Sequence, residues 1–242
     1  MTGVAALQAG PPDRRSRNPP IRGRLAARLD VPERDGYTVS MPRGWSIVGW
    51  AALLVGVTVG SILALAGSGE DGLRIVIRAT ARISVILFTA AFAARALARA
   101  WPTAGTRWML ANRRYLGVSF AVSHVTHLIA IFALGGWSLA GVVARSAITP
   151  VVLGGIGYAF LAAMTATSFD WSAAWLGPRR WSRLHTTGAY WLWSIFFVSF
   201  APRVTQSPLY WPFAFVLLAA LVLRLSDRRL RRTAGLTVAT AR

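Results

Sequence analysis

The chain has 242 residues, of which 55% are hydrophobic and 14% are charged, and its mean hydropathy is +0.48. Soluble domains usually carry about a quarter of charged residues, so this composition excludes an ordinary cytosolic enzyme and a disordered chain. All 27 basic residues are arginines, against 8 acidic residues. The absence of cysteine excludes disulfides, thiolate metal sites and cysteine catalysis.

The first 44 residues form a segment unlike the rest of the chain. They contain six prolines and eight arginines but few large apolar residues, which predicts a disordered Arg/Pro-rich cytoplasmic arm with a short helix over residues 21–29. A cleavable secretory signal is the rival interpretation, because Ala64-Leu65-Ala66 resembles a cleavage site. The long segment before it and the long apolar run favour an uncleaved membrane anchor.

Six apolar segments have the length of membrane-spanning helices, for which about 20 mostly apolar residues are needed. Glycine, proline, serine or charged residues mark the short connections between them. The sequence therefore predicts an all-α integral membrane protein, with a six-helix transmembrane domain over residues 45–225 and a basic tail over residues 226–242. The predicted spans are residues 45–66, 75–97, 115–134, 149–167, 184–201 and 209–225.

The distribution of arginine predicts the orientation of these helices. Arginines gather in the N-terminal arm, in the second–third and fourth–fifth connections and in the tail, whereas the opposite side keeps only Arg74, Arg145 and Arg203. The positive-inside rule then places both termini on the cytoplasmic side of a bacterial-type inner (plasma) membrane. The same placement explains the net charge of +19 without nucleic acid, because most arginines flank apolar stretches.

Ionisable residues inside the predicted spans are the candidates for function, because a charged or polar group in the bilayer is costly. They are His124 and His127 in the third span, His185 at the start of the fifth, and Arg78 and Arg82 in the second. A buried imidazole in a helical bundle ligates haem iron, relays protons or packs as a hydrogen-bonded core residue. Zinc is disfavoured, because the acidic residues lie in the connections.

One segment resembles a known family. Thr167-Ser168-Phe169-Asp170, followed by Leu176-Gly177, Trp181, Leu184-His185 and Tyr190, is similar to the fourth-to-fifth-helix signature of the ferric reductase-like transmembrane family. Within that family it is nearest to the haem-binding membrane subunits of periplasmic methionine sulfoxide reductase systems. The segment from Arg113 to Gly117, with His127 ten residues beyond, resembles the third helix of those subunits, and Arg78-Ala79-Thr80-Ala81 resembles part of the second.

The resemblance implies b-type haem held between helices by imidazoles, and electron transfer across the membrane. His127 and His185 match ligand positions of the family, so they are the predicted axial ligands of haem iron. The family has a further histidine near the outer end of the fifth helix, where this chain has Val198. His124 matches no ligand position of the family.

The depths of the two histidines argue against one shared iron. At about 1.5 Å per residue, His127 lies roughly 20 Å beyond Arg114, whereas His185 lies roughly 3 Å beyond Arg183. Two half-sites remain. An outer half-site would combine His127 with the arginine stripe that contains Arg78 and Arg82, either binding haem propionates or snorkelling to headgroups. An inner half-site would combine His185 with Met164, acting either as a ligand or as packing.

Two further features have open interpretations. Asp170 is expected to cap the short segment between the fourth and fifth spans or to pair with Arg179 or Arg180. The aromatic stretch of the fifth span would either wall a porphyrin or contact lipid; its members are Tyr190, Trp191, Trp193, Phe196 and Phe197.

The resulting prediction is a metal-binding oxidoreductase subunit that depends on partner proteins. It would pass electrons through haem b from a cytoplasmic flavoprotein carrying FMN, or from the quinol pool, to a periplasmic redox partner or ferric iron. A haem-free scaffold or assembly subunit of the same fold is the main alternative. A small transporter with a proton relay through His124 and His127 is another.

Overall fold

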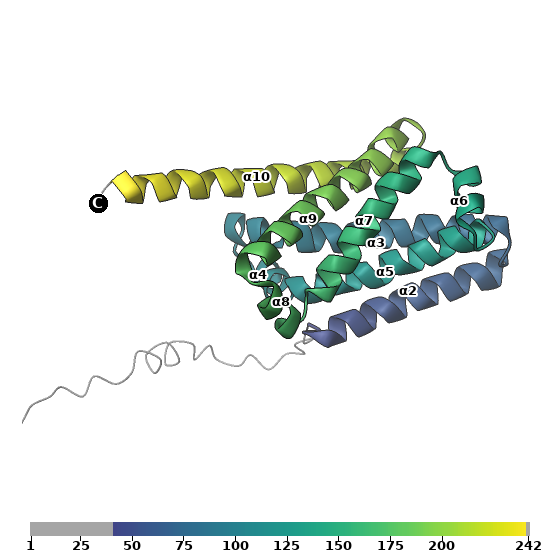
Figure 1. Ribbon diagram of the computed structural model, residues 1–242, viewed down its shortest axis with the longest axis horizontal. Helices are drawn as coiled ribbons and strands as arrows, with labels where there is room; N and C mark the ends of the chain where they lie inside the picture. Colours follow the sequence, from purple (N-terminus) through teal and green to yellow (C-terminus); the bar gives the residue numbers. More distant parts are fainter. Residues whose placement is uncertain (1–40, 241–242) are drawn as a thin grey trace, which may run out of the picture. The chain divides into compact units, whose positions relative to one another are not determined.

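The structure is a computed structural model that describes residues 41–240, with side chains up to residue 230. The predicted arm up to residue 40, including the predicted helix over residues 21–29, lies outside the described residues. Within residues 41–240 every regular element is a helix. The long helices are α2 (Trp45–Ala66), α3 (Glu70–Ala100), α5 (Arg113–Leu134), α7 (Ile148–Ala166), α9 (Pro178–Phe200) and α10 (Trp211–Thr240) (Figure 1).

Short helices occupy four of the five predicted connections. They are α4 (Ala104–Ala111), α6 (Leu139–Arg145), α8 (Asp170–Leu176) and two 3₁₀ turns, η1 (Ala201–Thr205) and η2 (Pro208–Tyr210). α4 and α8 lie at one end of the bundle, which we name the α4/α8 end, and α6 lies at the other (Figure 1). At its C-terminus α10 continues as a helix to Thr240, so the tail predicted to begin at residue 226 is helical over most of its length.

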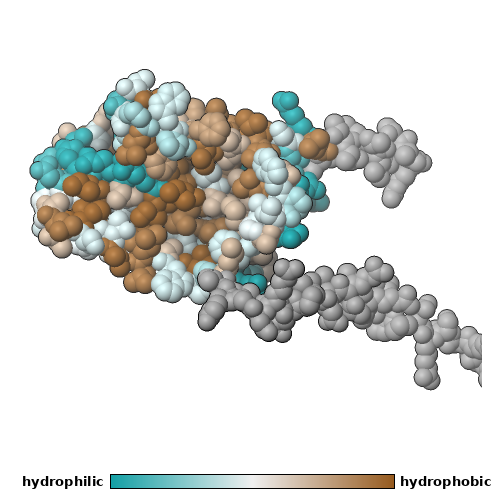
Figure 2. All heavy atoms as spheres, turned by 180° about the vertical axis from the view of Figure 1, so that it is seen from behind, coloured by the Kyte–Doolittle hydropathy of each residue, from teal (hydrophilic) through white to brown (hydrophobic). Residues whose placement is uncertain are grey.

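Five stretches are long and apolar enough to cross a membrane: α2, α3, α5, α7 and the stretch from Pro208 to Leu230. Their outward side chains are apolar, as Phe215 of α10 and Val57 of α2 illustrate, and hydrophobic residues cover much of the middle of the face in Figure 2, with hydrophilic residues gathered toward its ends. The protein is therefore an all-α, multi-pass membrane protein in contact with the lipid bilayer. The predicted fifth span is α9, whose histidine, threonines and tryptophans make it less apolar than the other five.

Aromatic side chains form the core between α3, α5 and α9. The ring of Phe88 lies 5.4 Å from that of Phe120 and 5.2 Å from that of Phe196. Two other aromatic residues of α9 fix its neighbours, because the indole N–H of Trp191 donates to Leu153 O of α7 and that of Trp193 donates to Leu217 O of α10. The aromatic stretch that was expected to wall a porphyrin or face lipid thus also ties α9 into the bundle.

Small hydroxyl residues form the seam between α3 and α5. Thr80, Ser84 and Ser123 are completely buried there. The Ser84 hydroxyl donates to Ser123 Oγ at 3.0 Å, and the Ser123 hydroxyl donates to Thr80 O at 3.2 Å. Small residues allow close approach of helices in a membrane, and hydrogen bonds between them add to the packing. This close seam places the third predicted span, with its two histidines, directly against α3.

The turn between α2 and α3 depends on glycine. Gly67 has a φ of +74°, which glycine adopts without strain. A side-chain carbon at Gly72 would overlap the carbonyl oxygen of Gly67. The first turn of α3 can therefore lie this close to the end of α2 only because residue 72 has no side chain. α3 begins at Glu70, five residues before the predicted boundary, because Glu70 and Asp71 suit the positive end of a helix.

Candidate functional site

His127 lies in the α3–α5 seam with one ring nitrogen bound to protein. Its Nδ1 is 3.0 Å from Ile77 O and 3.2 Å from Thr80 Oγ1. The Thr80 hydroxyl already donates to Val76 O at 2.7 Å, so the Nδ1–H of His127 is the donor in both contacts. The Nε2 atom is consequently unprotonated in the neutral ring. A backbone carbonyl that holds Nδ1–H in this way is the usual support of a metal-ligating imidazole.

His124 stacks between aromatic groups one turn before His127. Its ring centroid is 5.2 Å from that of His127 at an interplanar angle of 9°, and 4.9 Å from that of Tyr158 of α7. The rings of Phe120 and Phe196 lie within 5.4 Å. His124 Nδ1 is buried without a hydrogen-bond partner among the described residues. His124 is therefore packed among four protein rings.

The arginines of α3 do not join His127. Arg78 is exposed, and the guanidinium of Arg82 lies 5.6 Å from the ring centroid of Tyr210 in η2. Thr80 lies on the side of α3 that faces α5, because it contacts His127. A residue two positions further along an α-helix is rotated by about 200° around the helix axis, so Arg82 lies on roughly the opposite side of α3. The structure thus directs Arg82 toward η2, so the outer half-site considered from the sequence is not brought together.

His185 lies in the first turns of α9, at the α4/α8 end. Its Nε2 is 3.0 Å from Thr167 Oγ1. Because the Thr167 hydroxyl donates to Ala163 O at 2.7 Å, the Nε2–H of His185 donates to Thr167. Trp181, one turn earlier, stacks on the imidazole with centroids 4.1 Å apart and donates its indole N–H to Thr167 O at 2.9 Å. Thr167 belongs to the first part of the motif that resembles the family, and Trp181 and His185 belong to the second, so the two parts contact each other here.

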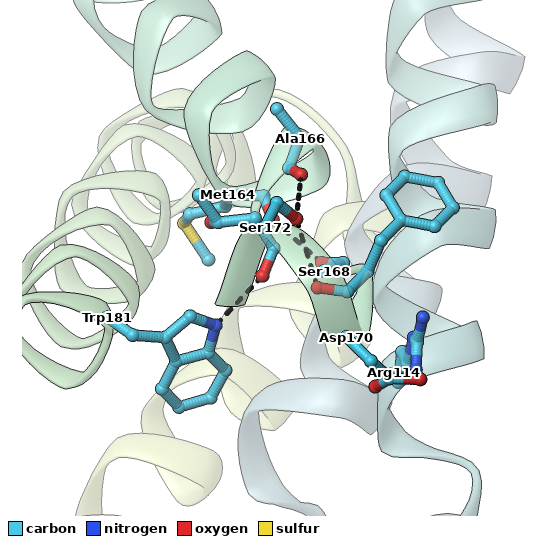
Figure 3. Close-up of polar contacts among 9 residues, drawn as sticks. Arg114, Met164, Ala166, Ser168, Asp170, Ser172 and Trp181 are labelled. Carbon is cyan, nitrogen blue, oxygen red and sulfur yellow. Dashed lines mark hydrogen bonds and ion pairs between the residues drawn. The ribbon is translucent and has the colours of Figure 1, made fainter. Parts of the chain in front are cut away.

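Further hydrogen bonds hold the corner between α7 and α8 (Figure 3). The Ser168 hydroxyl donates to Met164 O at 2.7 Å, and the Ser172 hydroxyl donates to Ala166 O at 2.6 Å. Asp170 pairs with Arg114 of α5 at 2.8 Å. The expected pairing of Asp170 with Arg179 or Arg180 is wrong, because α8 begins at Asp170 and carries its carboxylate to the start of α5.

A cavity of about 280 Å³ opens beside this corner. His185, Met164 and Arg114 border it, together with Arg113 and Arg224. Its volume is close to the lower end of the range for small-molecule sites. The structure therefore brings together the two residues of the inner half-site. The apolar part of its wall includes Phe88, Phe92, Phe120, Leu161, Ala189 and Leu192.

Met164 is placed at this cavity by a glycine of α9. A side-chain carbon at Gly188 would lie 2.5 Å from the sulfur of Met164, so the thioether fills the space that Gly188 leaves. Gly188 is three residues after His185, which puts both on the side of α9 that faces α7. Packing thus accounts for the position of Met164, and the same packing leaves its side chain in the cavity wall.

A second cavity of about 280 Å³ adjoins the first. The two share Phe92, Arg113, Trp181, His185 and Arg224. Neither cavity is bordered by His127, so the two predicted ligands have separate surroundings. Val198, at the family's further histidine position, is 66% exposed and points away from the bundle.

Arg113 and Arg224 border both cavities, and neither was among the predicted site residues. Arg113 Nε donates to Ala91 O at 3.0 Å, and Arg224 Nη1 donates to Phe92 O at 2.9 Å. The guanidinium of Arg224 also lies 4.1 Å from the ring centroid of Phe92. A signal was present for Arg224, since it lies inside the apolar run of the last predicted span. For Arg113 the signals were the charge of a connection and its place in the segment from Arg113 to Gly117 that resembles the third helix of the family.

The comparisons with known proteins add no assignment. The chain matches no protein-family model, no curated protein sequence and no solved structure. Within the described residues there is no group of three or more histidine and acidic side chains that could hold a metal ion by itself.

Proposed function

We propose that this chain is a membrane-embedded b-haem electron-transfer subunit of the ferric reductase-like kind. It would pass electrons from a flavoprotein or quinol donor to a periplasmic acceptor. One observation carries the proposal: the imidazole of His185 and the thioether of Met164 border one cavity with apolar walls. Imidazole and thioether are the axial ligand types of many haem proteins.

The residues around this cavity fit the chemistry of haem b. His185 and Met164 would supply a nitrogen and a sulfur ligand, and Phe88 and Phe120 belong to the apolar part of the wall. Arg114 would supply a positive charge for a haem propionate at the border of this cavity. The side chain of its partner Asp170 is 96% exposed, so solvent weakens their ion pair and Arg114 stays available. Bound haem supplies one-electron chemistry. Ligation through Nε2 requires that His185 give up its hydrogen bond to Thr167.

The proposal includes six crossings of a bacterial-type inner membrane. α9 has 23 residues, or about 34 Å at 1.5 Å per residue, which suffices for the hydrocarbon core. Counted with the five more apolar stretches, it puts both ends of the membrane domain on one side. The positive-inside rule makes that side the cytoplasm. The cavity at the α4/α8 end would then open toward a cytoplasmic donor.

The test is the absorption spectrum of the purified chain. We expect oxidised and dithionite-reduced spectra of full-length protein from haem-replete cells to show a b-type band, with stoichiometry from a pyridine haemochrome assay. His185→Ala should abolish the band, and Met164→Leu should shift it, whereas Met109→Leu in α4 serves as the matched control. A folded preparation without haem, or haem retained at full stoichiometry by His185→Ala, would refute the proposal.

A haem-free scaffold or assembly subunit is the second candidate, and the contact of His185 favours it. Thr167 already accepts the Nε2–H of His185, so the imidazole has a hydrogen-bonded position in the protein without haem. Under this function, folded protein shows no haem band, and affinity purification of the full-length chain recovers a periplasmic partner. A stoichiometric haem band contradicts this candidate.

A further inference from the structure

The second cavity has an unusual excess of positive charge. Among the described residues that line it are four arginines from three helices: Arg95 of α3, Arg113 of α5, and Arg224 and Arg228 of α10. The described lining includes one carboxylate, Asp227, which pairs with Arg99 at 2.7 Å. The cavity therefore suits an anion, because the one carboxylate on its wall already has a cationic partner.

Three of the four arginines of this cavity have contacts that hold them in place. Arg113 and Arg224 each donate one N–H to a carbonyl oxygen of α3, at 3.0 and 2.9 Å. Arg228 lies 4.8 Å from the ring centroid of Tyr190. A guanidinium has five N–H donors, so these contacts fix the side chains and use only a small part of their donor capacity. Arginines that only satisfy the positive-inside rule need not converge on a cavity in this way.

Two helix starts add to the positive potential. Arg113 is the first residue of α5, and Trp181 and Ser182 lie in the first turns of α9. The N-terminal end of a helix carries a partial positive charge, which favours phosphate. Ser182 and Thr186 also place hydroxyl-bearing residues in the lining, while Phe92 and Ala96 give it an apolar portion.

We propose that this cavity binds the phosphate group of an anionic phospholipid from the leaflet at the α4/α8 end. Guanidinium groups pair with phosphate through parallel N–H···O bonds, and basic pockets between transmembrane helices are known to take lipid headgroups. The apolar part of the lining suits the glycerol and upper acyl portion of a lipid better than a free ion. The inference rests on the cavity and its charge, and it holds with or without haem in the neighbouring cavity.

The experiment measures lipid binding by the full-length chain in neutral detergent, using native mass spectrometry and thermal unfolding. The probes are phosphatidylglycerol, phosphatidylcholine and inorganic phosphate. We expect wild type to bind phosphatidylglycerol in preference to phosphatidylcholine. The double variant R95Q/R228Q, whose residues border only the second cavity, should bind about 25-fold more weakly, because each arginine near an anionic membrane surface gives roughly a fivefold gain.

The matched control is R179Q/R180Q, which removes the same charge from exposed positions of α9 that border neither cavity. It should retain affinity within about twofold of wild type. If the double variant does not fold, the single variants R95Q and R228Q replace it. Equal loss in the control pair would show general surface attraction and overturn the proposal. So would equal binding of both lipids, or stabilisation by inorganic phosphate that matches phosphatidylglycerol.

Discussion

Replacement of Thr167 by valine should uncouple His185 from α7. Valine has nearly the shape of threonine but lacks the oxygen that accepts the Nε2–H of His185 at 3.0 Å. An unsatisfied buried donor costs about 1–3 kcal/mol, and interhelical hydrogen bonds in membrane proteins average about 0.6 kcal/mol. Because His185 borders a cavity, we expect the coupling between the two side chains to be close to the smaller value.

The assay is a double-mutant cycle in reversible unfolding of the full-length chain by denaturing detergent. Thr167→Val, His185→Phe and the double variant are compared with wild type, and phenylalanine retains a ring to stack on Trp181. The expected coupling free energy is about 0.6 kcal/mol. Thr165→Val is the matched control, since Thr165 borders the same cavity and has no hydrogen bond from its side chain within the described residues.

The cycle has a clear negative result. A coupling free energy below about 0.3 kcal/mol lies within the usual additivity of independent sites, and it would show that Thr167 and His185 do not interact. Coupling of the same size in the Thr165 cycle would assign the effect to general packing at the cavity.

Three other predictions follow from the packing. Val198→His should leave haem stoichiometry unchanged in the pyridine haemochrome assay, because position 198 faces outward; a second haem per chain would contradict this. Gly72→Ala should destabilise the protein by roughly 3 kcal/mol or more in detergent unfolding, since its side chain meets backbone atoms of Gly67, whereas Gly60→Ala, in open space, should be neutral or stabilising. Asp170→Asn should leave the unfolding midpoint nearly unchanged, because the Asp170 side chain is 96% exposed; a large fall would show that its ion pair is structural.

Local patterns in the sequence were sufficient to predict the six long helices, although not the short helices of the connections. The first predicted span has the same bounds as α2, and the bounds of the third and fourth lie within two residues of those of α5 and α7. An apolar run of membrane length bounded by glycine, proline or charge specifies a helix almost without regard to its neighbours. The fifth span was harder to delimit, because α9 begins at Pro178, well before its apolar part.

The contacts of the polar residues were decided by the tertiary structure. Periodicity fixes the direction in which a side chain points on its own helix, but the rotation of that helix against its neighbours depends on packing between them. The buried seam of Thr80, Ser84 and Ser123 therefore turned His127 toward α3 and left Arg82 facing η2.

The inner half-site was also predicted in part from the sequence and decided in part by the tertiary structure. The sequence placed His185 and Met164 at similar depth, as hydrophobic length and helical rise allow. Only the fold brought Arg113 and Arg224 to the same cavity, although they lie more than a hundred residues apart in the chain. In the sequence Arg113 is a basic residue of a connection and Arg224 is an ionisable residue near the end of the last span, and nothing in the pattern relates them. Their convergence arises because α5 and α10 both pack on α3, where adjacent carbonyl oxygens, at Ala91 and Phe92, accept their hydrogen bonds.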